Sequence, residues 1–228
     1  MRFCLWIVFL MFSNFVFAQS APGNIRFNLT FGSQPVEIGK NYYSPATGDS
    51  IKLEVVKFYI SHLQFFRDNI PLAVLKKQHM LVDAGNPETL HFPIPEEAAG
   101  KFNRVVFNLG TDSLTNVSGA FGGDLDPTKG MYWAWQSGYI NLKLEGVSKA
   151  CPARNHYFQF HIGGYQSPFP SCQIIDLPAI AKNDLTIEVA LDSFFSQVNI
   201  AETYQIMSPG QQAVSFARLF ASLFSLAK

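Results

Sequence analysis

The chain has no excess of charge of either sign, because lysine plus arginine and aspartate plus glutamate number 17 each in 228 residues. Without a positive surface a protein does not capture nucleic acid or anionic lipid, so we expect neither partner. No apolar run reaches the about 20 residues of a transmembrane helix, and we expect no stable membrane insertion. Walker, kinase, G-x-S-x-G and H-E-x-x-H motifs are missing too, so we expect a protein that is not an enzyme.

The amino terminus has the pattern of an export signal. It begins with Met1-Arg2, continues through the apolar residues 3–12 and closes with the small residue Ala18. We therefore predict a signal peptide over residues 1–18 and a mature protein that is periplasmic or secreted. The mature chain, residues 19–228, has the length of a single all-β domain.

Cysteine is scarce, since only Cys151 and Cys172 remain after the predicted cleavage. An even number of cysteines in an exported chain favours a disulfide. The bridge would close a loop around residues 157–162 and stabilise the fold by about 3 kcal/mol. A Cys/His metal site is the alternative, but an oxidising compartment removes the thiolates that such a site needs.

Strand patterns dominate the rest of the chain. Alternating, β-branched or aromatic runs separated by turn residues predict an all-β fold, a β-sandwich of short antiparallel strands. The predicted strands are residues 25–31, 53–66, 72–75, 80–83, 104–109, 139–144, 157–162 and 185–191. The tail differs, because apolar residues recur at helical spacing over residues 211–226, which predicts a C-terminal amphipathic helix that docks on the sandwich.

Both tryptophans of the mature chain, Trp133 and Trp135, lie two residues apart in one strand-like segment. In a single regular strand over residues 131–144 both indoles would lie on the face opposite the apolar row that begins at Ile140. Alternatively, Gly138 marks a bulge that reverses the faces of the strand. For the two rings, half-buried packing and a functional pair are alternatives of about equal weight.

Other functions compete for these residues. Trp133, Trp135 and Tyr139 are candidates for a flat platform that stacks on sugars in a carbohydrate-binding or adhesion module. Glu145 and Asp126 would be the carboxylates of a glycosidase, which needs such a pair about 5 to 10 Å apart, and we rank this function lowest.

Several segments of the sequence also resemble a known protein family. Residues 123–139, with the pattern W-x-W-x-S-G-Y, are followed by Lys-Leu-Glu-Gly at 143–146 and by Phe-Gln-Phe-His-Ile-Gly at 158–163. Together with residues 55–65 and 81–84, these segments resemble the MbnP-like copper-binding proteins, which include the MopE- and CorA-type proteins. The resemblance covers most of the mature chain.

The resemblance implies an exported β-rich domain that binds copper for acquisition, storage or delivery. In some members of the family a di-haem, MauG-like peroxidase oxidises a tryptophan to kynurenine, whose aromatic amine binds copper beside histidines. Nitrogen donors of this kind suit copper in either oxidation state. Carried over to this chain, His161 is the first expected ligand and Trp133 or Trp135 the oxidised residue, with Trp135 preferred. The second expected histidine is His79, followed by His62.

Overall fold

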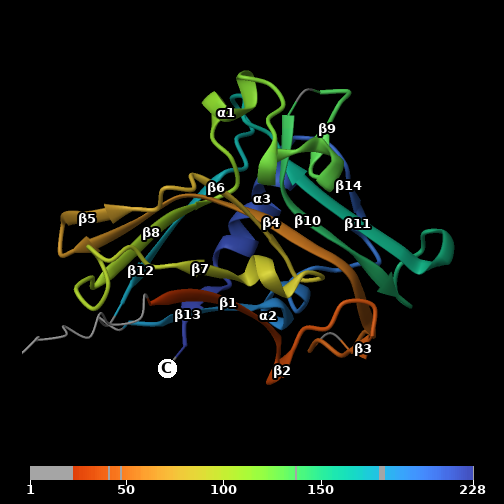
Figure 1. The fold of residues 1–228 in the computed structure, drawn as a ribbon. Helices are drawn as coiled ribbons and strands as arrows, with labels where there is room; N and C mark the ends of the chain where they lie inside the picture. Colours follow the sequence, from red (N-terminus) through yellow and green to blue (C-terminus); the bar gives the residue numbers. More distant parts are fainter. Residues whose placement is uncertain (1–22, 41, 47, 137, 180–182, 228) are drawn as a thin grey trace, which may run out of the picture.

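The structure is a computed structural model that describes residues 23–227 except positions 41, 47, 137 and 180–182 (Figure 1). The predicted signal peptide lies outside these residues. In chain order the elements are β1 (Asn24–Phe31), β2 (Gln34–Pro35), β3 (Tyr42–Tyr43), β4 (Ile51–Arg67), β5 (Ile70–Val74), β6 (His79–Asp83), η1 (Pro87–Leu90), β7 (His91–Pro93), β8 (Arg104–Leu109), α1 (Ser113–Val117), η2 (Gly123–Leu125), η3 (Pro127–Lys129), β9 (Tyr132–Trp133), β10 (Gly138–Ser148), η4 (Arg154–His156), β11 (Tyr157–Gly163), β12 (Gln173–Pro178), β13 (Leu185–Ala190), α2 (Leu191–Phe195), β14 (Gln205–Ile206), α3 (Gln211–Ala221) and β15 (Phe224–Leu226).

The strands form two sheets, which confirms the predicted all-β sandwich. The small sheet has the order β15-β13-β1-β2, with β7 also paired to β1. The large sheet has the order β12-β8-β4-β10-β11-β14, with β3, β5 and β6 on β4 and β9 on β10. The expectation of short antiparallel strands needs two corrections. The pairs β1–β13 and β11–β14 are parallel, and β4 has 17 residues.

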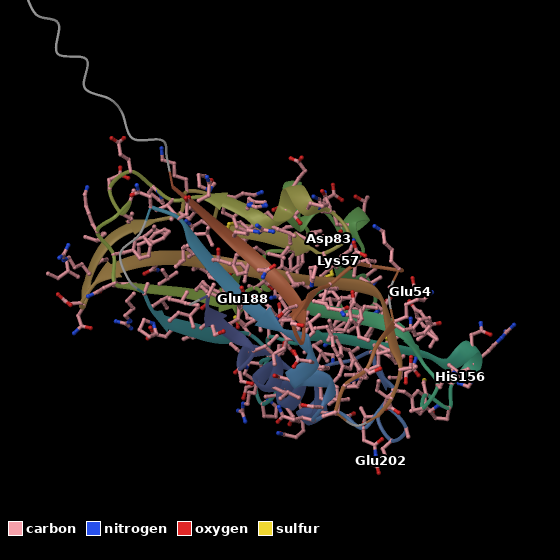
Figure 2. All side chains as sticks on the ribbon, turned by 90° about the horizontal axis from the view of Figure 1, so that it is seen from below. Glu54, Lys57, Asp83, His156, Glu188 and Glu202 are labelled. Atoms are coloured by element: carbon pink, nitrogen blue, oxygen red, sulfur yellow. The ribbon has the colours of Figure 1, made fainter. Side chains whose placement is uncertain are left out.

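The main core lies between the two sheets because alternate residues of each strand point inward. Phe58 of β4 and Leu144 of β10 belong to this core, whereas their neighbours Lys57 and Lys143 lie on the opposite face of the large sheet, here called the outer face. Figure 2 labels Lys57 beside Asp83 of β6, with which it forms an ion pair (Nζ–Oδ2 3.0 Å).

The predicted C-terminal helix is present but shorter than expected. Helix α3 ends at Ala221, and the chain then forms β15, which pairs with β13 through Phe224 opposite Val189. The helix ends here because the residues that follow it adopt an extended conformation and pair with β13 as an antiparallel strand. Ala217 and Phe220 place the apolar face of α3 in the main core. No helix in the described residues has the length and apolar character required to span a membrane.

The segment between β8 and β10 covers part of the outer face, and its elements α1 and β9 both lie at the top of Figure 1. It forms a second apolar cluster with residues of β4, β6 and β10. The members of this outer cluster are Tyr59, Leu81, Leu125, Met131, Trp133, Tyr139 and Ile140. Part of the outer face is therefore buried beneath this segment, and the buried cluster positions Trp133.

Candidate metal site

Trp133 lies at the end of β9 and is held by a hairpin rather than by one long strand. Its backbone pairs with Gly138 at the start of β10, and residues 134–136 form a turn. The regular strand considered for residues 131–144 is therefore interrupted. The register of β10 also shifts between Ile140 and Leu142, so the bulge lies beyond Gly138. These two irregularities turn the indole of Trp133 into the outer cluster, where only 5% of the residue is exposed.

Gly163 at the end of β11 provides the space for this indole. A Cβ atom at Gly163 would lie 2.6 Å from Cζ3 and 2.9 Å from Cη2 of Trp133, closer than real Cβ atoms approach. The benzene ring of Trp133 therefore rests directly on the glycine backbone, and a side chain here would displace it.

The indole nitrogen of Trp133 has no hydrogen-bond partner. It is the one buried side-chain nitrogen or oxygen of the described residues in this condition. A buried N–H group without a partner costs about 1–3 kcal/mol, and such groups are rare enough in proteins to require an explanation.

Trp135 lies in a different environment. It is 66% exposed, and its ring contacts that of Trp133 with centroids 5.7 Å apart and planes tilted by 45°. One ring is buried and the two are not coplanar, so they do not form the flat exposed face expected of a sugar-binding platform.

His161 lies in β11 on the outer face, 7% exposed and opposite Lys143 of β10. Its Nε2 atom is 2.6 Å from Oε1 of Glu145. Tyr157 donates to Oε2 of the same carboxylate (2.7 Å), and the ammonium of Lys143 is 3.3 Å from Oε1. Burial alone would raise the pKa of Glu145, but the bonds from His161 and Tyr157 and the charge of Lys143 outweigh it and lower the pKa to about 2.

His161 and Trp133 approach the same face of β11. Residues 161 and 163 are two positions apart in one strand and therefore point to the same side of the sheet. The ring of Trp133 occupies the place of a side chain at Gly163, two positions along the strand from His161. The structure thus places these two predicted site residues on one face of β11.

His62 is placed elsewhere, at a register shift in β4 where its φ of 52° is left-handed. Its Nε2 atom is 2.7 Å from Oδ2 of Asp112, and its Nδ1 atom is 3.1 Å from Oε1 of Gln78. Gln78 donates its own amide to Leu75, so it presents an acceptor to the ring. Both ring nitrogens of His62 therefore face acceptors, and neither directs a lone pair to a metal ion.

His79 is the neighbour of His62 and not of His161. The rings of His62 and His79 have centroids 5.5 Å apart, and His79 Nε2 is 3.0 Å from the hydroxyl of Thr115 in α1. Burial, followed by the proximity of His62, lowers the pKa of His79.

Strand order separates the two histidine groups. The row that contains His161 continues through Lys143 and Lys57 to Asp83, so β11 and β6 are three strand spacings apart, about 14 Å. His79 lies four residues farther along β6. In the described part of the chain, no group of three histidine, cysteine, aspartate or glutamate side chains is placed to hold a metal ion.

The predicted disulfide is not present, because Cys151 and Cys172 are both free thiols. They lie at opposite ends of β10. Cys151 follows its last residue, Ser148, whereas Cys172 follows Ser171, which bonds to Asn141 near the start of the strand. The seven residue steps from Asn141 to Ser148 span about 23 Å, whereas the Cα atoms of a disulfide are about 5.5 Å apart. Burial raises the pKa of Cys172 to about 11, which also disfavours a thiolate ligand.

Sequence patterns give no site role at this centre to two residues. Glu145 is a candidate glycosidase carboxylate and part of the Lys-Leu-Glu-Gly motif, and Gly163 is only part of a motif. Strand alternation places Glu145 on the same face as Lys143, but the register of β10 against β11 is needed to set it opposite Gln159 and beside His161. The sequence signal for Gly163 is its position two residues after His161, which places a residue without a side chain on the same face of the strand as the histidine.

Comparison with known proteins agrees with the fold. The sequence pattern of the MbnP family matches residues 20–208. Curated protein sequences give no match. Among solved structures, MbnP from Methylosinus trichosporium is similar, with a TM-score of 0.58 and 15% sequence identity over 79% of each chain. At this identity the structural likeness shows a shared fold. Because the family pattern covers most of the sequence, the chain belongs to the MbnP family.

Proposed function

We propose that this protein is exported and binds copper, for acquisition, storage or delivery rather than for catalysis, at a site formed by His161 and Trp133. One observation carries the proposal. The indole of Trp133 lies on Gly163, on the face of β11 that also carries His161 two residues earlier, and its nitrogen is buried without a partner.

The chemistry of the two side chains supports a copper site. Imidazole is the commonest metal ligand among side chains and suits copper. An intact indole is a poor ligand because its nitrogen lone pair belongs to the aromatic system. Oxidative cleavage of the indole Cγ–Cδ1 bond by peroxide, followed by hydrolysis that releases Cδ1 as formate, leaves the former Nε1 as an aromatic amine. We propose a di-haem, MauG-like peroxidase as the partner that catalyses the oxidation.

The geometry favours Trp133 over Trp135 as the oxidised residue. Trp135 is largely exposed, and the indole atoms nearest to the Cβ position of Gly163 belong to Trp133. An amine produced from Trp133 would instead replace a buried N–H group that has no partner. We therefore revise the preference that the family resemblance suggested.

Copper titration of purified variants tests the proposal. We expect His161→Ala to weaken copper binding by at least about 10-fold, because it removes the one imidazole of the site. His91→Ala is the matched control, since His91 is an exposed histidine in β7 of the small sheet. We expect this control to bind copper like the wild type. Equal affinity in the His161→Ala and wild-type proteins would remove the site from consideration.

Mass spectrometry of the protein isolated with its oxidising partner tests the modification separately. Conversion of tryptophan to kynurenine adds about 4 Da to one peptide. We expect the increase on Trp133 and not on Trp135, and we expect it to be absent in Trp133→Phe. An increase on Trp135 alone would contradict the assignment.

A further inference from the structure

Glu145 is a carboxylate of the outer face that is only 9% exposed. It receives bonds from His161 and Tyr157 and an ion pair from Lys143. Three partners from β10 and β11 thus converge on one side chain. Burying a carboxylate is costly unless such partners compensate, so this arrangement is a built site rather than an incidental contact.

The bonding of Glu145 determines which nitrogen of His161 carries the proton. The phenol of Tyr157 donates to Oε2 and the ammonium of Lys143 lies 3.3 Å from Oε1, so both oxygens of Glu145 act as acceptors. The short Nε2–Oε1 contact of 2.6 Å therefore requires a proton on Nε2. In the neutral ring the lone pair is then on Nδ1, for which no partner is found among the described residues.

The carboxylate itself is fixed. The phenol of Tyr157 holds Oε2, and burial together with the bond to Glu145 raises the pKa of that phenol, so it stays a donor. Lys143 holds Oε1 from the other side and is anchored by the carbonyl of Gly130 (3.2 Å), next to β9. The group that orients His161 is thus tied to the segment that carries Trp133.

We propose that Glu145 is a positioning residue that fixes His161 as the Nε2–H tautomer and presents Nδ1 to copper. The inference rests on the proposed function and specifies the ligand atom of that site. Carboxylates that bind the second nitrogen of a metal-bound histidine act in this way: they set the tautomer and the ring orientation.

The test begins with the copper-free protein. Nitrogen-15 NMR of the histidine rings reports the tautomer of His161, which we expect to be Nε2–H in the wild type. In Glu145→Gln the amide either accepts or donates, so we expect a mixture of tautomers. We also expect copper affinity to fall by about 10- to 100-fold, the usual effect of losing such a partner.

Two further variants keep the test interpretable. Tyr157→Phe removes the bond to Oε2 and leaves the contact with His161, so we expect the tautomer to be retained and the affinity to fall less than in Glu145→Gln. Glu188→Gln is the matched control, because Glu188 of β13 (labelled in Figure 2) receives side-chain bonds from Asn28 in the small sheet. We expect it to behave like the wild type.

The outcomes separate the two proposals. If Glu145→Gln retains the wild-type tautomer and copper affinity while His161→Ala loses copper, Glu145 is not a positioning residue and the proposed function stands. A wild-type protein that binds no copper would overturn the proposed function, and the tautomer, measured without copper, would still show whether Glu145 fixes the ring.

Discussion

At the scale of single residues, Asp124 attaches the segment before β9 to β6. Its carboxylate accepts the backbone N–H of Leu81 (2.9 Å) and forms ion pairs with Lys77 (2.7 Å) and Lys129 (3.6 Å). Its neighbour Asp126 caps η3 by accepting from the N–H of Thr128. The pair of aspartates therefore forms the turns that lead into the tryptophan hairpin.

Asp124 should make stability depend on pH. Burial would raise its pKa, but the bonds from Lys77 and Leu81 outweigh it and lower the pKa below the usual 3.8. Its contribution to folding is therefore present above the usual pKa and is lost as the pH falls through the lower pKa of the folded state. We expect Asp124→Asn to lower the free energy of unfolding at neutral pH by about 1 kcal/mol and to reduce its loss in acid.

Urea denaturation at several pH values measures both effects. Glu202→Gln, at an exposed position labelled in Figure 2, is the control and should leave the pH profile unchanged. A profile of Asp124→Asn that matches the wild type would show that the carboxylate makes no such contribution.

At the scale of elements, the close approach of β9 to β11 defines the candidate site. Strand β9 has two residues, and its pairing with the start of β10 directs Trp133 onto Gly163. The contact depends on the absence of a side chain at position 163, because the ring of Trp133 lies where a Cβ atom would be.

Gly163→Ala should break this contact. The added Cβ would lie 2.6 Å from Trp133 and 2.7 Å from the carbonyl of Tyr139, and the second partner is backbone that cannot rotate away. We expect the free energy of unfolding to fall by about 1–3 kcal/mol and the fluorescence of Trp133 to change. Gly122→Ala is the control, because nothing lies within 4 Å of its Cβ position and its φ of −89° suits alanine. Equal losses in the two variants would argue against the packing described for Gly163.

At the scale of the whole molecule, aromatic packing joins the two sheets. Phe27 of β1 makes edge-to-face contacts with Phe58 and Phe107 of the large sheet, and with Phe224 of β15 (centroids 6.2, 6.0 and 6.4 Å). It is completely buried. The sandwich therefore depends on a ring that reaches across the core from the centre of the small sheet.

Phe27→Ala should destabilise the protein by about 3–5 kcal/mol, since it removes the ring and leaves a cavity between the sheets. Ile174→Ala in β12 is the control, because Ile174 is 74% exposed and should change the free energy of unfolding by less than about 0.5 kcal/mol. Thermal and urea unfolding of both variants measure the difference. A small loss for Phe27→Ala would mean that the sheets are held together elsewhere.

Local patterns predicted much of the fold. The alternation in β1 and β13 and the long run of β4 identify strands, because the side-chain period of a half-buried strand is two residues. The pattern did not predict that β1 and β13 are parallel, or that β15 follows α3, because pairing partners far apart in sequence decide both. It also did not predict α1 or the short helical turns between β8 and β9.

Local patterns were enough to predict the sandwich class, the family resemblance, and the two short motifs that contain Trp133 and His161. The arrangement of the strands was needed to show that Trp133 is buried while Trp135 is exposed, that His161 is bonded to Glu145, and that His62 and His79 form a separate group. The tertiary structure also left Cys151 and Cys172 at opposite ends of β10. Each of these outcomes depends on strand order and register, because a shift of one residue in register reverses the face of every side chain in a strand.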